Sequence, residues 1–228
     1  MGIWFWFVLA FLGFALITLL RKWHDHAMLV TIAIGFAINA NIFNAFGYPI
    51  YLGPLPFSID SILYTGFMFC VVVCAIEYGV RNAKILASSA IAAILLSAVV
   101  EFLAKVSISG FSVEHLVGLS SYVFSAIGTF LGVWLMLWVL EKLKNKNVNV
   151  YLNIIICILI SSIVNSTIFY SFTILVSGVI DNIGYILLAS YIGKIICIGL
   201  CLLSFFINTH LFIPNALKEK YKKPKNIE

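Results

Sequence analysis

The chain has 228 residues, of which 63% are hydrophobic and 10% are charged, and its mean hydropathy is +1.10. This composition excludes a soluble globular protein. The net charge of +5 does not indicate nucleic-acid binding, because the basic residues lie at the ends of apolar segments and in the C-terminal tail, where they set the orientation of membrane helices.

Each apolar segment is long enough to cross a hydrocarbon layer of about 30 Å at a rise of about 1.5 Å per residue. We therefore predict an all-α integral membrane protein, a compact bundle of seven transmembrane helices. Residues 1–215 form its single domain, and residues 216–228 form a basic tail. The predicted spans are residues 2–20, 28–46, 58–80, 85–106, 116–140, 151–179 and 183–212.

Basic residues are distributed unevenly between the two ends of these spans. Of the 14 lysines and arginines, all except Lys105 and Lys194 fall on one side. The positive-inside rule then places the C-terminus in the cytoplasm and the N-terminus outside. Residues 2–20 have no basic start and no A-x-A cleavage pattern, so we expect a retained span and not a signal peptide. The predicted location is the inner (plasma) membrane of a bacterium, as a multi-pass protein.

The second span contains Asn39 and a pair of small residues, Ala33 and Ala37, on one helical face. Small residues four apart allow close helix packing, so this face is expected to contact a neighbouring helix. The segment 47–57 that follows has three prolines and two glycines, which cannot continue a helix. It is apolar and uncharged, and we interpret it as a loop that dips toward the membrane, a candidate lid.

Asp60 begins the third span, and the fourth span, 85–106, is rich in alanine and serine. We expect this smooth fourth span to be buried among other helices. Near its end, Glu101 precedes Lys105 by four residues, the favourable order for a helical ion pair. A short polar link, residues 107–114, is expected to lead into the fifth span.

The fifth span carries Gly128-x-x-x-Gly132, a helix-packing motif, and the sixth carries Asn165 among serines and a threonine. Lys194 lies in the middle of the seventh apolar run. A lysine at this depth costs on the order of 3 kcal/mol, so it is expected to face protein or a water-filled cavity. Helical rise places Asn39, Asn165 and Lys194 about 15–21 Å from the nearest loop, in one layer.

Glu101 lies within about 10 Å of the outer surface, and Asp60 and Asp181 lie at it, at the mouth of the funnel. The polar groups thus describe a funnel that opens outward, and aromatic residues such as Tyr170 are suited to stack on a planar solute. The candidate substrate-binding residues are Asn39, Asp60, Glu101, Asn165, Tyr170 and Lys194. Simpler roles stay open: the asparagines as interhelical hydrogen-bonding groups, Asp60 as a helix N-cap, and Glu101 as the partner of Lys105.

Two function classes fit this pattern. Transport of a small polar solute accounts for the funnel, whereas a scaffold, sensor or accessory subunit of a larger membrane complex needs none. An enzyme is not predicted, because the chain has no H-E-x-x-H, no G-x-S-x-G and no paired intramembrane aspartates. Neither a cofactor nor a metal is predicted. The five cysteines form no CxxC, and His24 and His26 have no further ligands nearby.

Four motifs carry a family resemblance: Ala75-Ile-Glu-Tyr-Gly-Val-Arg81, Val139-Leu-Glu-Lys-Leu-Lys144, Ser161-Ser-Ile-Val-Asn-Ser-Thr-Ile-Phe-Tyr170 and Ser190-Tyr-Ile-Gly-Lys194. Their order and spacing resemble the queuosine-precursor transporter family, also called the vitamin-uptake-transporter family, over roughly residues 38–212. The resemblance implies a six-helix core related to the S components of energy-coupling-factor transporters, preceded by one extra helix. It also implies import of 7-deazaguanine precursors of queuosine, or of a vitamin, into bacteria.

Within that family, a lysine occupies the position of Lys194, and an aspartate usually occupies that of Asn165. The chain has no phosphate-binding loop of the G-x-x-x-x-G-K-[ST] type, so it does not hydrolyse ATP by itself. It either works alone or uses an energy-coupling scaffold and its ATPases. Ala33-Ile-Gly-Phe-Ala37 resembles the motif by which S components dock on that scaffold.

Overall fold

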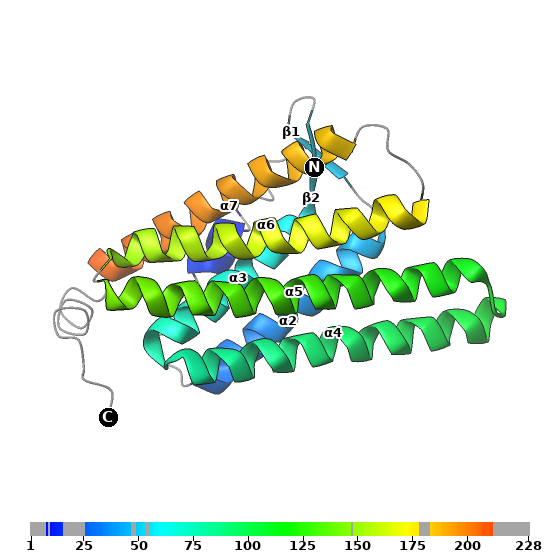
Figure 1. The fold of residues 1–228 in the computed structure, drawn as a ribbon, viewed down its shortest axis with the longest axis horizontal. Coiled ribbons are helices and arrows are strands. Elements are labelled where there is room, and N and C mark those ends of the chain that lie inside the picture. Colours follow the sequence, from blue (N-terminus) through cyan, green and yellow to red (C-terminus); the bar gives the residue numbers. More distant parts are fainter. Residues whose placement is uncertain are drawn as a thin grey trace.

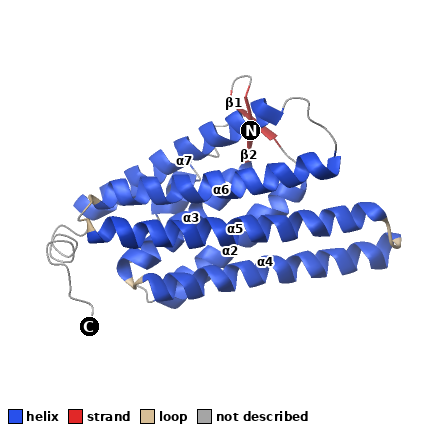
Figure 2. Ribbon diagram, viewed as in Figure 1, coloured by secondary structure: helices blue, strands red, loops and turns tan. Residues whose placement is uncertain are grey.

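The computed structural model describes residues 8, 10–15, 26–46, 49–52, 55–146, 148–177 and 183–211. Nearly all of these residues are helical (Figure 2). Besides helical residues at 10–15, the elements are α2 (His26–Phe46), β1 (Pro49–Leu52), β2 (Leu55–Ser58), α3 (Ile59–Glu77), α4 (Val80–Ser109), α5 (Val113–Asn145), α6 (Val150–Ser177) and α7 (Ile183–Leu211).

Five of the described helices, α3 to α7, are long and apolar enough to cross a membrane. The prediction of a helical chain with membrane-length apolar helices is therefore confirmed. α2 contributes a shorter apolar stretch, Leu29–Ala40. Its 21 residues still reach about 30 Å by helical rise.

α4 and α5 are longer than predicted, and they project farther than α6 on one side of the bundle (Figure 1). The polar link expected at residues 107–114 is mostly helical, and only residues 110–112 lie outside the two helices. The hydroxyls of Ser107 and Ser109 donate to carbonyls four residues earlier, at 2.7 and 2.8 Å, so these polar side chains are satisfied within the helix. Gly110 then adopts a φ of +77°, a conformation that glycine tolerates best.

α3 is the central helix, and it contacts α2, α4, α5, α6 and α7. Its residues 67–75 are almost completely buried. α2 packs on α3 and α4, and its Ala33 and Ala37 are both buried. The predicted close packing of this small-residue face is confirmed, and it takes place inside the chain, so Ala33 and Ala37 present no surface to a separate scaffold.

The expectation that the fourth span is buried among other helices is wrong. Only 28% of the membrane-length window of α4 is buried. Ala83, Ala87 and Ala90 lie on the buried face of α4, which contacts α2, α3 and α5, whereas Ser88 and Ala92 are exposed. The physical reason is that one face of small residues is enough for close approach, and composition does not reveal that α4 lies at the edge of the bundle.

α5 and α6 pack closely at the predicted glycine motif. A Cβ atom added to Gly132 would lie 2.8 Å from Ser161 Oγ and 2.9 Å from the Ser161 carbonyl oxygen. One added to Gly128 would lie 2.7 Å from Asn165 Oδ1. The role of Gly128-x-x-x-Gly132 in helix packing is thus confirmed, and the contact places Asn165 against α5.

The proline-rich segment forms an antiparallel hairpin in which Pro49 pairs with Ser58 and Leu52 with Leu55. β2 contacts both α7 and α3, so the hairpin lies beside the first turns of these helices (Figure 1). We call this side of the bundle the hairpin end. The prediction that the segment is not helical is confirmed, although paired strands were not expected.

Candidate functional site

A cavity of about 140 Å³ lies between the helices, toward the hairpin end. Five helices contribute to its wall. The residues that line it are Ala40 from α2, Asp60 and Tyr64 from α3, Ser125 from α5, Asn165, Ser166, Phe169 and Tyr170 from α6, and Ser190 and Lys194 from α7. Four of the six predicted substrate-binding residues therefore meet in one cavity: Asp60, Asn165, Tyr170 and Lys194.

Lys194 lies about 17 Å along α7 from its first residue, Ile183, and its side chain is only 5% exposed. Its ammonium group donates a hydrogen bond to the hydroxyl of Ser166. It also lies 5.3 Å from the centre of the Tyr64 ring, a cation–π contact. An ammonium group has three N–H donors, and this hydrogen bond uses one of them among the described residues, so two can serve a ligand.

Asp60 lies in the first turn of α3, where the helix dipole favours a carboxylate. The depth count placed it at the mouth of the predicted funnel, and it lines the cavity wall, where it interacts electrostatically with Lys194. The two are the only charged residues among the described residues of the wall. As carboxylate and ammonium they balance each other, so the described part of the wall has no net charge.

The remaining polar groups of the wall are neutral. Asn165 Oδ1 is buried and has no hydrogen-bond partner among the described residues. The Tyr170 phenol lies beside Ser190. Because hydroxyl and amide groups both donate and accept, this wall suits a ligand with both kinds of hydrogen-bonding group.

Two predicted residues lie elsewhere. The side chain of Asn39 is exposed and donates to the Gly35 carbonyl of its own helix at 2.8 Å, while its neighbour Ala40 reaches the cavity. Glu101 accepts a hydrogen bond from the Tyr122 hydroxyl and forms an ion pair with Lys105 at 2.6 Å. The predicted pairing of Glu101 with Lys105 is confirmed, and Glu101 is not part of the cavity wall.

Tyr64 was not among the predicted site residues, and Ser166 and Ser190 appeared only within longer motifs. A signal for two of them is present in the sequence. Tyr64 follows Asp60 by four residues, and Ser190 precedes Lys194 by four, so each pair shares one helical face. In these two pairs the shared face lines the cavity, whereas the same spacing in Glu101 and Lys105 does not lead to it.

Among the described residues, no three His, Cys, Asp or Glu side chains lie together in the way that a metal site requires. Asp181, which the depth count placed at the mouth of the funnel, lies outside the described residues. Comparison with protein-family models, with curated proteins and with solved structures finds no match for this chain. The family resemblance therefore rests on the sequence motifs alone.

Proposed function

We propose that the protein is a membrane transporter that imports a small polar solute through the cavity at Lys194 and Asp60. The main support for this proposal is that two oppositely charged residues line one cavity, among helices long enough to span a membrane. Ionisable residues inside a membrane are costly, and they commonly mark solute or ion pathways.

The interior beyond the cavity supports a site that loads from the hairpin end. Below Lys194 on α7, Cys197, Cys201 and Phe205 are almost fully buried. The rings of Phe69 and Phe205 meet edge to face at 6.3 Å between their centres. Farther along, the Lys144 ammonium donates to the Ala75 carbonyl at 2.8 Å and joins α5 to the end of α3. This packing separates the cavity from the opposite end, as alternating access requires of one state.

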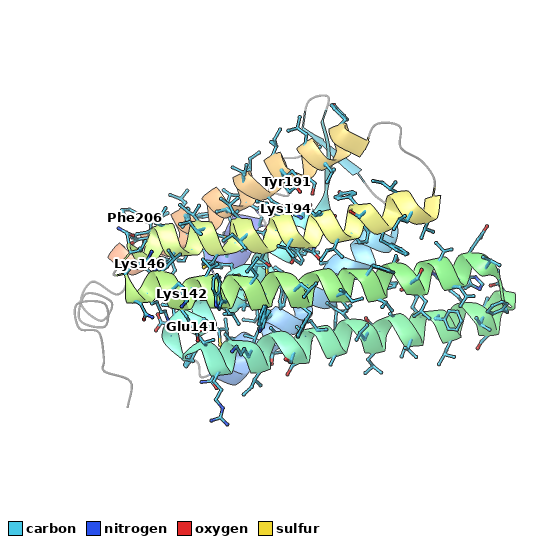
Figure 3. The ribbon with its side chains drawn as sticks, viewed as in Figure 1. Glu141, Lys142, Lys146, Tyr191, Lys194 and Phe206 are labelled. Carbon is cyan, nitrogen blue, oxygen red and sulfur yellow. The ribbon has the colours of Figure 1, made fainter. Side chains whose placement is uncertain are left out.

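The proposal includes seven spans, an outward hairpin end and a cytoplasmic C-terminus, in a bacterial plasma membrane. The helical residues 10–15 support a first span that belongs to the bundle, since Phe14 is fully buried and its ring lies 6.1 Å from that of Phe69. Lys142 and Lys146 lie at the end opposite the hairpin (Figure 3), as the positive-inside rule requires of a cytoplasmic face.

The burial of Ala33 and Ala37 favours a carrier that works alone over one that docks on an energy-coupling scaffold through this face. The family resemblance adds 7-deazapurines and vitamins as solutes to test.

Uptake into cells that lack their own transporters for these solutes tests the proposal. Lys194→Met should abolish uptake while the protein still folds and inserts, because it removes the buried ammonium and keeps a side chain of similar length. Lys142→Met is the matched control, since Lys142 is exposed at the opposite end. Uptake by the Lys194→Met variant at the rate of the Lys142→Met variant would contradict the proposed role of the cavity.

A second candidate function is that of an accessory subunit of a larger membrane complex. The exposed apolar face of α4, with Leu96, Val99, Val100 and Leu103, favours it, because such a face suits a partner helix as well as lipid. The two functions differ in what stabilises the purified protein. A transporter is stabilised by its solute, whereas an accessory subunit is stabilised only by its partner.

A further inference from the structure

The charge and the size of the cavity together restrict what it can hold. We infer that the site binds an electrically neutral solute, either uncharged or zwitterionic, of about the size of one substituted six-membered ring. An acceptor group of this solute faces Lys194, and a donor group faces Asp60. This inference rests on the proposed function and names the class of solute.

The neutrality of the wall requires that Asp60 and Lys194 share one proton. In that state they form either a carboxylate with an ammonium or a carboxylic acid with an amine, and both combinations have no net charge. A charged ligand would therefore bring an uncompensated charge into the membrane interior. The cost of such a charge at mid-membrane corresponds to about 100-fold in affinity. The cavity has an opening, which reduces this cost. We therefore expect neutral solutes to bind at least about tenfold more tightly than charged solutes of the same size.

The volume of the cavity limits the size of the solute. An engineered protein cavity of about 150 Å³ holds one benzene molecule, and the cavity at Lys194 measures about 140 Å³. Pockets for drug-sized ligands are at least about 300 Å³. The cavity thus accommodates one ring with a small substituent, or a small zwitterion, in the conformation that the structure describes.

The hydrogen-bonding groups give the ligand an orientation. Two donors of the Lys194 ammonium remain beyond its bond to Ser166, so the deep part of the cavity offers donors. Asp60, in the first turn of α3, offers acceptor oxygens nearer the hairpin end. Tyr64 and Phe169 add aromatic rings to the same wall. A flat ring with an acceptor on one edge and a donor on another matches the donors of Lys194, the acceptors of Asp60 and the aromatic rings of the wall.

Thermal unfolding of the purified full-length protein, with millimolar compounds added, tests the inference directly. The compounds are two series matched in size: nicotinamide, nicotinate and 3-(aminomethyl)pyridine, and benzamide, benzoate and benzylamine. Alanine represents small zwitterions, and 7-deazaguanine represents fused rings. We expect a neutral one-ring compound or alanine to stabilise the protein at a concentration at least about tenfold lower than any charged member requires.

Charge variants provide the sharper test. Asp60→Asn leaves one net positive charge in the wall and should shift the preference to the anionic members, whereas Lys194→Gln should shift it to the cationic ones. The double variant restores neutrality and should restore the preference for neutral compounds, even if a single variant fails to fold. Glu141→Gln and Lys142→Gln change the charge equally at the opposite end and should leave the order unchanged (Figure 3).

The inference is overturned if a charged member stabilises the unaltered protein best, if only 7-deazaguanine does so, or if no compound does. It is also overturned if the charge variants keep the original order. Uptake into vesicles separates this outcome from the proposed function. Selective binding without uptake would refute transport and leave the inference standing, whereas uptake of charged solutes would refute the inference and leave transport standing.

Discussion

Replacing Gly132 by alanine tests the close contact between α5 and α6, which places Asn165 in the cavity wall. The added Cβ would lie 2.8 Å from Ser161 Oγ and 2.9 Å from the Ser161 carbonyl oxygen. A hydroxyl group can rotate away, but a helical carbonyl cannot, so the two helices must separate by a few tenths of an ångström. Overpacking of this kind costs about 1–3 kcal/mol.

Gly118→Ala is the matched control, because Gly118 lies on the same helix and a Cβ there would meet nothing within 4 Å. Both substitutions gain about 1 kcal/mol of helix propensity, so the difference between the variants isolates the packing cost. We expect Gly132→Ala to be less stable than Gly118→Ala by about 2 kcal/mol. For a chain of this length that corresponds to roughly 4–8 °C in melting temperature.

The five cysteines are free, and all are buried, so a fluorogenic thiol reagent reports unfolding of the bundle. Melting curves of the two variants and the unaltered protein, recorded in the same detergent, give the comparison. Equal melting temperatures for Gly132→Ala and Gly118→Ala would refute the close packing at residue 132. The contact that holds α6, and with it Asn165, in the cavity wall would then be unsupported.

Ser166→Ala should reduce solute uptake at subsaturating concentration by about tenfold or more, because it removes the hydroxyl that orients the Lys194 ammonium, and hydrogen bonds to charged groups contribute about 1.5–3 kcal/mol. Initial uptake rates measure this, and an unchanged rate would show that Ser166 does not position the lysine. Tyr122→Phe should leave uptake unchanged, because the hydrogen bond that it removes, from Tyr122 to Glu101, lies outside the cavity wall. It should lower the free energy of unfolding by only about 1 kcal/mol, because Glu101 is 31% exposed and solvent weakens the bond. Loss of uptake in this variant would return Glu101 to the solute pathway.

The membrane class, the helical segments and the break at residues 47–57 follow from the sequence because they depend on local properties. Apolar length, prolines and glycines decide them without reference to distant residues. Lys194 could be singled out for the same reason, since a lysine in an apolar run requires a polar environment in any fold. The glycine motif on the fifth span likewise predicted a close contact, which the structure locates at Ser161 and Asn165.

Local sequence properties could not show which residues line the cavity. The depth of a residue along a helix does not determine the direction in which its side chain points. Asn39 has the right depth, but its side chain turns to its own helix, and a step of one residue, about 100°, brings Ala40 to the cavity instead. Glu101 was placed in the funnel by depth alone. Its side chain is 31% exposed and is already paired with Lys105 and Tyr122.

Composition alone therefore determined that this chain forms apolar helices and that a charge within them requires a polar surrounding. Only the tertiary structure decided which helical faces meet. It brings Asp60 and Lys194, which are 134 positions apart in the chain, into one wall, and it buries Ala33 and Ala37 while leaving much of α4 exposed. The reason is that helix order and rotation depend on side-chain packing between distant segments, which no single span encodes.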